Sequence, residues 1–163
     1  MPIAPVKALR ESGLSAEEAR AYRDSLPGKE GAEVLGQALT DRMFRVPTEE
    51  LCDARVGAEG HTYLYQSAWR SPAMGGVLGA AHCVDVPFAF DNLDAAGVEV
   101  ALGPEPPQAL ADSMHRAWVD FATDGDPRWP AFRLDTRPAM VFNGESTVVL
   151  DPLGLPRSLW GAA

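Results

Sequence analysis

The residues of this chain best suited to chemistry lie around His82, in the run Gly79 to Phe90. Small residues precede the histidine, and an apolar segment follows it. A free imidazole has a pKa of about 6.5, so it takes up and returns protons near neutral pH. Small neighbours leave room for such a ring to stand clear of the backbone, and His82 is therefore the leading candidate for a general base.

Other uses of these residues have less support. His82, Cys83 and Asp85 are all zinc-ligand types, but the chain has no C-x-x-C or H-E-x-x-H spacing, so no metal site is expected. Cys83 is disfavoured as a nucleophile because adjacent loop residues usually project apart. A purely structural loop histidine remains the simplest alternative. His61 and His115 are expected on the surface, partly solvated.

A hydroxyl nucleophile to accompany the histidine is hard to find. Gly144-Glu145-Ser146 matches the first half of a G-x-S-x-G elbow, in which a serine stands on a sharp strand-to-helix turn. Thr147 and Val148 follow where a small residue and a glycine should stand. Serines are common in turns, so Ser146 is expected to be structural.

Composition indicates an ordinary globular chain. Its 163 residues fit one domain or part of one, and 46% are hydrophobic. With 14 basic and 23 acidic residues the net charge is −9, and no basic cluster stands out. Nucleic acid and anionic membranes are therefore not expected as partners.

The chain shows no targeting or membrane signal. Its first residues lack a basic segment followed by an apolar core, and no run of about 18 apolar residues occurs. A cytoplasmic location is slightly favoured, with the compartment left open. Cys52 and Cys83 are expected to be reduced, buried thiols.

The first third of the chain predicts helices. Ser15 and Glu18 form a capping box that starts a helix ending near Leu26. Apolar residues at helical spacing predict a second helix over Ala32–Met43. Proline and acidic residues predict a third over Pro47–Gly57.

The remaining chain must position the histidine. His61–Gln66 is rich in β-formers and predicts a strand, which leads through the Gly- and Pro-rich loop Ser71–Gly79 to His82. A long helix is predicted over Gln108–Ala122, with Trp118 and Phe121 in the core. Its expected apolar face comprises Leu110, Met114, Ala117, Trp118 and Phe121.

The chain is predicted to end in a hairpin of Ala139–Phe142 and Thr147–Leu150, joined by an Asn-Gly turn. The expected class is therefore α/β, with too few strands for a complete doubly wound domain. We expect residues 1–163 to form one segment, helical over 1–60, with the strand, histidine loop, long helix and hairpin over 61–163.

Several segments together resemble the type B carboxylesterases, a family of the α/β-hydrolase fold that includes cholinesterases and para-nitrobenzyl esterases. Thr40–Pro47 resembles the family's "D..F..P" segment, and Thr62–Gln66 resembles its last core strand. Leu78–Phe90 is similar to its histidine motif, "GA.HG.E.P.VF". Met114–Phe121 and Gly125–Pro130 look like its "W..FA..G.P...WP" stretch.

The resemblance implies the C-terminal part of an α/β-hydrolase fold, with His82 as the triad histidine. Asp85 matches a position where the family more often has Glu, and Cys83 replaces a small residue. The nucleophilic serine and the acid precede the histidine in the family. Both are therefore expected upstream of Met1, together with the oxyanion hole, and the chain alone is expected to be inactive.

By the same resemblance, the complete protein hydrolyses small carboxylic esters through a Ser-Glu/Asp-His triad and uses no cofactor. Phe88 and Phe90 are expected near the substrate pocket, and Asp85 is expected to support the loop. The implied partner is the N-terminal portion of the hydrolase domain. Apolar faces that normally meet that portion would favour self-association. The alternative function is a non-catalytic binding module of the same fold.

Overall fold

The computed structural model describes residues 5–29 and 31–161, which form two compact units. The helical unit contains the described residues up to Val56 and those from Leu153 onward, and the sheet unit contains Gly57–Pro152. The sequence predicts a single segment that is helical over residues 1–60. In the structure the C-terminal helix packs against other helices of the helical unit and is grouped with them.

The helical unit contains five α-helices and one π-helical segment among its described residues. They are α1 (Pro5–Glu11), α2 (Ala16–Asp24), α3 (Ala32–Thr40), η1 (Asp41–Arg45), α4 (Val46–Ala54) and α8 (Gly154–Trp160). The predicted capping box is confirmed: the Ser15 hydroxyl accepts a hydrogen bond from the Glu18 N–H at 3.2 Å, and the Glu18 carboxylate accepts one from the Ser15 N–H at 2.7 Å. Helices α1 and α8 have seven residues each, and the sequence pattern predicts neither of them.

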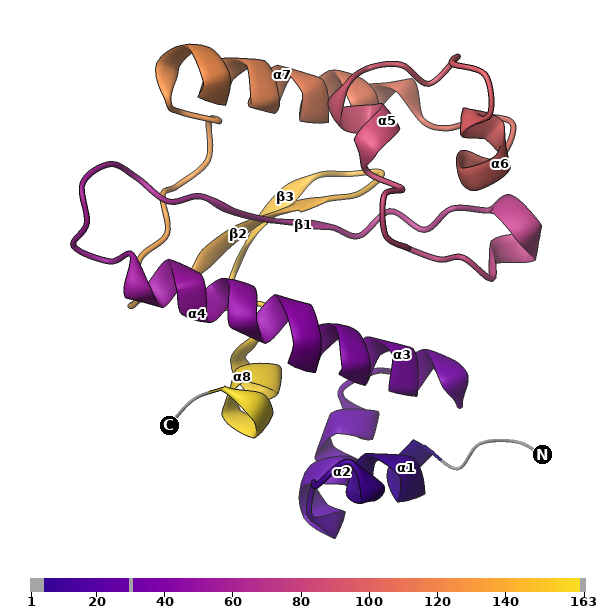
Figure 1. Ribbon diagram of the computed structural model, residues 1–163, viewed down its shortest axis with the longest axis vertical. Helices are drawn as coiled ribbons and strands as arrows, with labels where there is room; N and C mark the ends of the chain where they lie inside the picture. The colour runs from indigo at the N-terminus through magenta and orange to yellow at the C-terminus, as the bar shows by residue number, and fades with distance from the viewer. Residues whose placement is uncertain (1–4, 30, 162–163) are drawn as a thin grey trace. The chain divides into compact units, whose positions relative to one another are not determined.

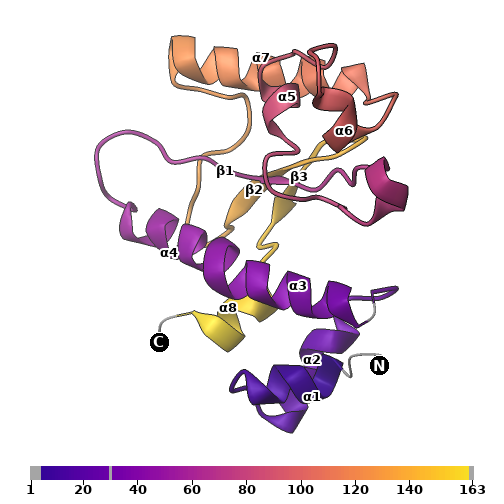
Figure 2. The same cartoon turned by 45° about the vertical axis from the view of Figure 1, so that its right-hand side comes forward.

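The prediction of separate second and third helices is wrong. Helix α3 continues through η1 into α4 without a break, as Figure 1 and Figure 2 show. Within η1 the Val46 N–H donates to the Asp41 carbonyl, five residues earlier, which is a π-helical bond. Pro47 has no N–H to continue the ordinary ladder, and its ring would clash with the carbonyl four residues before it. The wider π turn accommodates the proline inside a continuous helix.

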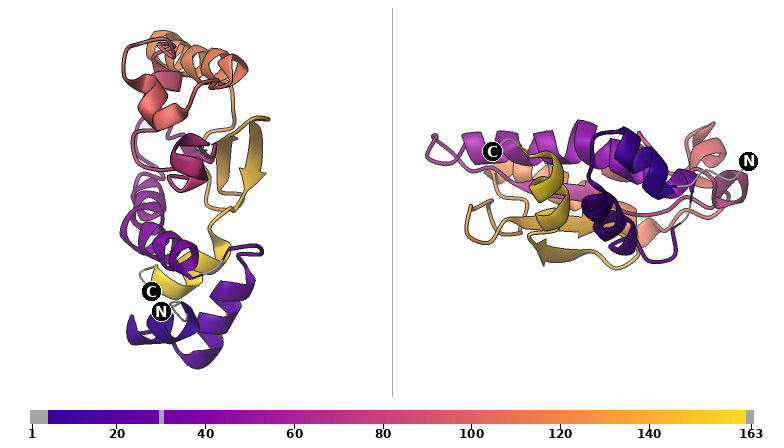
Figure 3. Two further views of the ribbon diagram at one scale, coloured as in Figure 1. Left: turned by 90° about the vertical axis from the view of Figure 1, so that its right-hand side faces the viewer. Right: turned by 90° about the horizontal axis from the view of Figure 1, so that it is seen from below.

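The sheet unit carries the residues of chemical interest. Its strands are β1 (Leu64–Ser67), β2 (Pro138–Phe142) and β3 (Thr147–Leu150), and its helices are η2 (Ala73–Gly76), α5 (Val86–Ala89), α6 (Val98–Leu102) and α7 (Gln108–Asp124). β1 pairs with β2 in parallel, with Leu64 opposite Ala139. The predicted hairpin is confirmed as the antiparallel pair β2–β3, visible in the left view of Figure 3.

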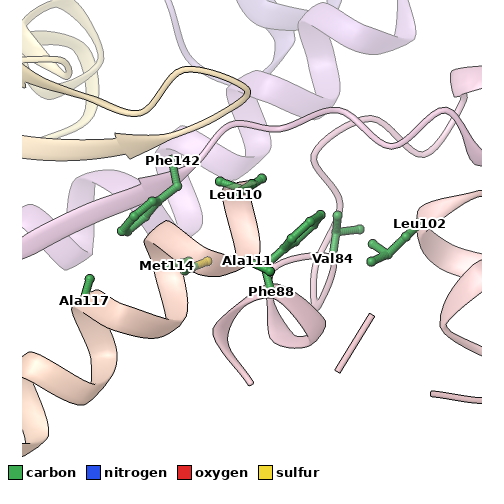
Figure 4. Close-up of a cluster of buried hydrophobic side chains, with 8 residues drawn as sticks. All are labelled: Val84, Phe88, Leu102, Leu110, Ala111, Met114, Ala117 and Phe142. Carbon is green, nitrogen blue, oxygen red and sulfur yellow. The ribbon is translucent and has the colours of Figure 1, made fainter. Parts of the chain in front are cut away.

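The core of the sheet unit lies between α5, α6, α7 and β2. Figure 4 shows its eight buried side chains, in which Phe142 of β2 lies beside residues of α7. The predicted long helix is confirmed, and Gly125 ends it in the left-handed conformation that glycine adopts without strain. His115 of α7 donates from Nδ1 to the Ala89 carbonyl at 2.9 Å, which joins α7 to α5.

The placement of Trp118 and Phe121 in the core is wrong. Their exposed fractions are 41% and 43%, because the buried stripe of α7 instead follows Leu110, Ala111, Met114 and Ala117. The two rings lie beside this stripe and pack edge-on against tyrosines that flank or belong to β1. Tyr65 and Trp118 have ring centroids 5.6 Å apart, and Tyr63 and Phe121 have centroids 5.9 Å apart.

Candidate active-site histidine loop

His82 lies in a turn of the histidine loop, which we define as residues 79–90. The loop begins at an isolated bridge between Ser71 and Gly79 and includes α5 near its end. The His82 side chain is exposed, and within the described residues its ring forms no hydrogen bond or ion pair. The imidazole is therefore open to an incoming group.

Buried residues hold the two ends of this loop in place. At its start, Ser71 is 1% exposed; its N–H donates to the Gly79 carbonyl at 3.0 Å and its hydroxyl donates to the Ala101 carbonyl. At its end, Val84 and Phe88 are buried in the core of the sheet unit. The turn that carries His82 is thus anchored on both sides. Sequence reasoning missed Ser71, since a single serine in a Gly- and Pro-rich loop gives no distinguishing signal.

The backbone conformation at position 79 explains why this residue is a glycine. Its φ is +57°, and a Cβ at this position would lie 3.5 Å from Cζ of Arg70. Glycine adopts this left-handed backbone without strain, whereas the contact with the guanidinium would be an ordinary one for a Cβ. This conformation lets the chain turn from the bridge toward His82.

Asp85 is connected to β1 through Tyr65. The Tyr65 side chain hydrogen-bonds to the half-buried Asp85 side chain. Burial, the negative charge of Asp85 and this hydrogen bond together raise the pKa of Tyr65 above its ordinary value of about 10. The phenol therefore remains a donor at neutral pH and links the histidine loop to the strand. Asp85 as loop support stays a prediction, and this contact gives it a physical basis.

Cys83 differs from expectation in its exposure. Its side chain is exposed, whereas Cys52 is buried as predicted, and neither cysteine forms a disulfide. Cys83 has a φ of +66°, in the region that residues with a Cβ rarely adopt. Glycine, which follows the histidine in the family motif, adopts this turn without that strain because it has no Cβ. The tight turn that exposes His82 also turns the thiol outward.

The two phenylalanines proposed for a pocket lie in different surroundings. Phe88 is 1% exposed and packs edge-on against Trp69, with ring centroids 5.0 Å apart, so its ring serves the core. Phe90 is 71% exposed. Of the pair, only Phe90 offers an accessible surface for a substrate. Its pocket role stays a prediction.

The remaining candidates lie in unremarkable surroundings. His61 is exposed, and His115 is half-buried through its bond to α5. Ser146 lies in the hairpin turn, where its hydroxyl donates to the Asn143 carbonyl at 3.4 Å. Across residues 5–29 and 31–161, no three His, Cys, Asp or Glu side chains gather closely enough to hold a metal ion. In the same residues, no helix combines the length and apolar character that a bilayer-spanning helix needs.

The sequence matches the carboxylesterase family over residues 7–149, and the chain belongs to that family. It is 31% identical over 159 residues to phenmedipham hydrolase of Pseudarthrobacter oxydans, covering 92% of this chain and 31% of that protein. It is 29% identical over 126 residues to para-nitrobenzyl esterase of Bacillus subtilis, covering 70% of this chain and 24% of the relative.

Solved structures give the same assignment. The carboxylesterase EST55 of Geobacillus stearothermophilus superposes with a TM-score of 0.76 at 32% identity, covering 94% of this chain and 33% of that one. A para-nitrobenzyl esterase structure gives a TM-score of 0.72 at 25% identity, covering 97% and 33%. The predicted α/β-hydrolase class is confirmed. The chain spans about a third or less of the length of these relatives.

Proposed function

We propose that this chain is the histidine-bearing C-terminal part of a serine carboxylesterase. Its family and fold are those of carboxylic-ester hydrolases. In the proposal, His82 is the base of a Ser-Glu/Asp-His triad whose serine and acid belong to polypeptide beyond this chain. The single observation that carries the proposal is the exposed His82 ring on a loop anchored at both ends.

The proposed chemistry follows from the imidazole. His82 accepts the serine proton as the serine oxygen attacks the ester carbonyl, which gives a tetrahedral intermediate. The imidazolium returns that proton to the departing alcohol, leaving an acyl-enzyme. His82 then takes a proton from water, whose oxygen attacks the acyl carbon, and returns it to the serine as the carboxylic acid leaves. No cofactor takes part in this sequence.

Asp85 and Tyr65 are proposed to position the base without touching the substrate. Their hydrogen bond ties the turn after His82 to β1. A fixed turn limits the positions that the ring can take, and small displacements of a catalytic group cost large factors in rate. Asp85 is therefore a positioning residue in this proposal.

The remainder of the hydrolase domain is proposed to pack on an apolar face of the helical unit. We define the outer face as the side chains of Leu39, Met43 and Leu51, which are 57%, 60% and 62% exposed. Met43 lies four residues after Leu39, and Leu51 lies eight residues after Met43. The three side chains therefore lie on one side of the continuous helix. Val34, Ala38 and Cys52 are buried on the other side. The short span of this chain relative to its relatives supports the missing portion as the partner.

The test is hydrolysis of p-nitrophenyl acetate by the full-length gene product. We expect His82→Ala to lower kcat/KM by about 10⁴-fold or more, because members of a triad act as a unit. His61→Ala is the matched control, since it removes an exposed histidine of the same unit, and its rate should match the parent's. An unchanged rate for His82→Ala would overturn the proposal and favour the non-catalytic binding module. The 163-residue chain alone should show no turnover above buffer.

A further inference from the structure

Ser71 lies outside the histidine loop, yet its hydrogen bonds reach three segments around it. The serine is 1% exposed, and its N–H donates to the Gly79 carbonyl at 3.0 Å. Its hydroxyl donates to the Ala101 carbonyl at 2.5 Å and accepts a hydrogen bond from the Ala73 N–H at 3.0 Å. One buried side chain and its backbone therefore connect the start of the histidine loop with η2 and α6.

The Ser71 hydroxyl serves two backbone groups that have no partner within their own helices. Ala73 begins η2, and the first N–H groups of a helix have no acceptor inside it. Ala101 lies in the last turn of α6, where the final carbonyls have no donor inside the helix. Pro104, three residues later, has no N–H to offer. Without an oxygen at position 71, the Ala73 N–H would be buried without an acceptor and the Ala101 carbonyl would lose this donor.

The end of α6 also approaches η2 closely at Gly103. This residue ends α6 with a φ of +79°, and a Cβ there would lie only 3.1 Å from Cγ of Pro72. The two segments therefore meet at Ser71 and at the residue that follows it. A shift of α6 away from η2 would break the hydrogen bond and separate this contact.

Helix α6 in turn packs against the chain that follows His82. Leu102 of α6 is 0% exposed and belongs to the same buried cluster as Val84, and the two side chains point toward one another in Figure 4. Val84 lies two residues after His82. Ser71 therefore acts on both sides of the turn: directly before it at Gly79, and after it through α6 and Val84.

We propose that Ser71 is a positioning residue for His82. Its backbone bond fixes the chain before the turn, and its hydroxyl fixes α6 and with it the chain after the turn. The effect on the rate rests on the proposed function, whereas the effect on the turn rests on the fold alone. A displacement of about 1 Å at a reacting group can cost about 100-fold in rate, so loss of the hydroxyl should slow catalysis although the buried serine does not reach the substrate.

The first measurement uses the 163-residue chain and does not depend on ester hydrolysis. NMR relaxation of the backbone amides of residues 80–84 gives order parameters for the turn. We expect values of about 0.85 in the parent and below about 0.6 in Ser71→Ala. Phe132→Leu is the matched control, because Phe132 is buried in the same unit but lies outside the histidine loop and the cluster of Val84. Its truncation should lower the urea midpoint of unfolding and leave these order parameters at the parent's values.

The second measurement is hydrolysis of p-nitrophenyl acetate by the full-length gene product. Ser71→Ala should lower kcat by about tenfold to 100-fold and keep KM within about twofold of the parent's, because the side chain does not contact the substrate. Phe132→Leu should keep both constants within about twofold. Ser71→Cys retains a weak donor and acceptor, so in reducing buffer its kcat should fall less than that of Ser71→Ala. The cysteine variant takes the place of Ser71→Ala in both measurements if the alanine variant does not fold.

Two outcomes would overturn the positioning role. One is a set of order parameters for residues 80–84 that is the same in Ser71→Ala and Phe132→Leu. The other is an equal kcat for these two variants in a protein that His82→Ala inactivates. An active His82→Ala protein would instead contradict the proposed function, and the order parameters alone would then decide whether Ser71 holds the turn.

Discussion

Cys83 is the neighbour of the candidate catalytic histidine and has an unfavourable backbone conformation. It follows His82 directly and has a φ of +66°. An L-residue in the left-handed region costs about 1–2 kcal/mol relative to the right-handed one, whereas glycine has no such steric cost. Glycine also loses more freedom on folding, which offsets about 0.5–1 kcal/mol of that gain.

We therefore expect Cys83→Gly to raise the free energy of unfolding of the 163-residue chain by about 0.5–1 kcal/mol. Urea titrations give this difference. Cys83→Ala is the control, because alanine removes the thiol and retains the Cβ. If Cys83→Ala stabilises the chain as much as Cys83→Gly, the thiol rather than the backbone is responsible, and the strain argument fails.

The candidate site was predictable at the residue level only in part. His82 stands out in the sequence because small residues flank it and a recognisable motif surrounds it. The bond between Tyr65 and Asp85 depends on where β1 runs relative to the loop, and no spacing rule gives that position. The same holds for Phe88, whose burial depends on the packing of α5 against α7.

At the level of elements, Asp41 joins three helical segments of the helical unit. It is 1% exposed, and its carboxylate accepts hydrogen bonds from the Tyr22 hydroxyl of α2 at 2.7 Å and from the Gln37 amide of α3 at 2.9 Å. Arg45 of η1 forms an ion pair with it. Burial and Asp41 raise the pKa of Tyr22, so the phenol remains a donor.

Asp41→Asn should lower the free energy of unfolding by about 2–4 kcal/mol. The substitution places an amide NH₂ among donors and leaves the Arg45 cation without its carboxylate. Thermal melts followed by circular dichroism measure this loss. Asp24→Asn is the matched control, because Asp24 pairs with Arg23 on the surface and such pairs contribute about 0.2–1 kcal/mol or nothing. Equal losses for the two variants would show that the network does not hold these helices together.

The raised pKa of Tyr65 predicts how the stability of the sheet unit changes at alkaline pH. Its pKa is raised in the folded state, so its contribution to stability is fully present below its unfolded pKa of about 10. That contribution is lost as the pH rises from about 10 through the folded value, because the unfolded chain releases the phenol proton first.

The parent chain should therefore lose more unfolding free energy than Tyr65→Phe between about pH 9 and pH 11.5. Urea titrations across this range give the two slopes. Tyr63→Phe is the control, since it removes a neighbouring phenol and leaves the contact between Tyr65 and Asp85 intact, and its slope should follow the parent's. A Tyr65→Phe slope as steep as the parent's would contradict the assignment.

The elements that the sequence predicted correctly carry strong local signals. The capping box marked the start of α2, and the Asn-Gly turn marked the hairpin. The prediction of a separate helix starting at Pro47 was wrong because proline ordinarily stands at the start of a helix. Here the π turn of η1 accommodates it inside a continuous one. The short helices α5 and α6 have four and five residues, too few to show a helical period, and tertiary packing decides them.

At the scale of the whole molecule, each unit has its own core, yet large apolar side chains remain exposed. In the helical unit the outer face contrasts with a buried opposite side of the same helix. A helix that is apolar on both sides normally packs against something on each. The chain spans about a third of its relatives' length, and the proposed function assigns this face to the remainder of the hydrolase domain.

The 163-residue chain alone should therefore associate with increasing concentration through the outer face. Met43→Gln combined with Leu51→Gln should reduce that association and the binding of an apolar dye, because both side chains are mostly exposed. The unfolding midpoint should stay unchanged, since neither residue belongs to the buried core. Sedimentation velocity and dye fluorescence measure the first two properties.

Val77→Gln is the control, because Val77 is an apolar residue of the sheet unit that is 84% exposed and lies outside the outer face. If it reduces association as much as the double variant, general surface hydrophobicity is responsible. In the proposed function the N-terminal portion of the hydrolase domain covers the same face, so adding that portion should suppress self-association of the parent chain. The double variant should bind the N-terminal portion more weakly than the parent chain does. If the two bind it equally well, the proposed contact with that portion does not lie on the outer face.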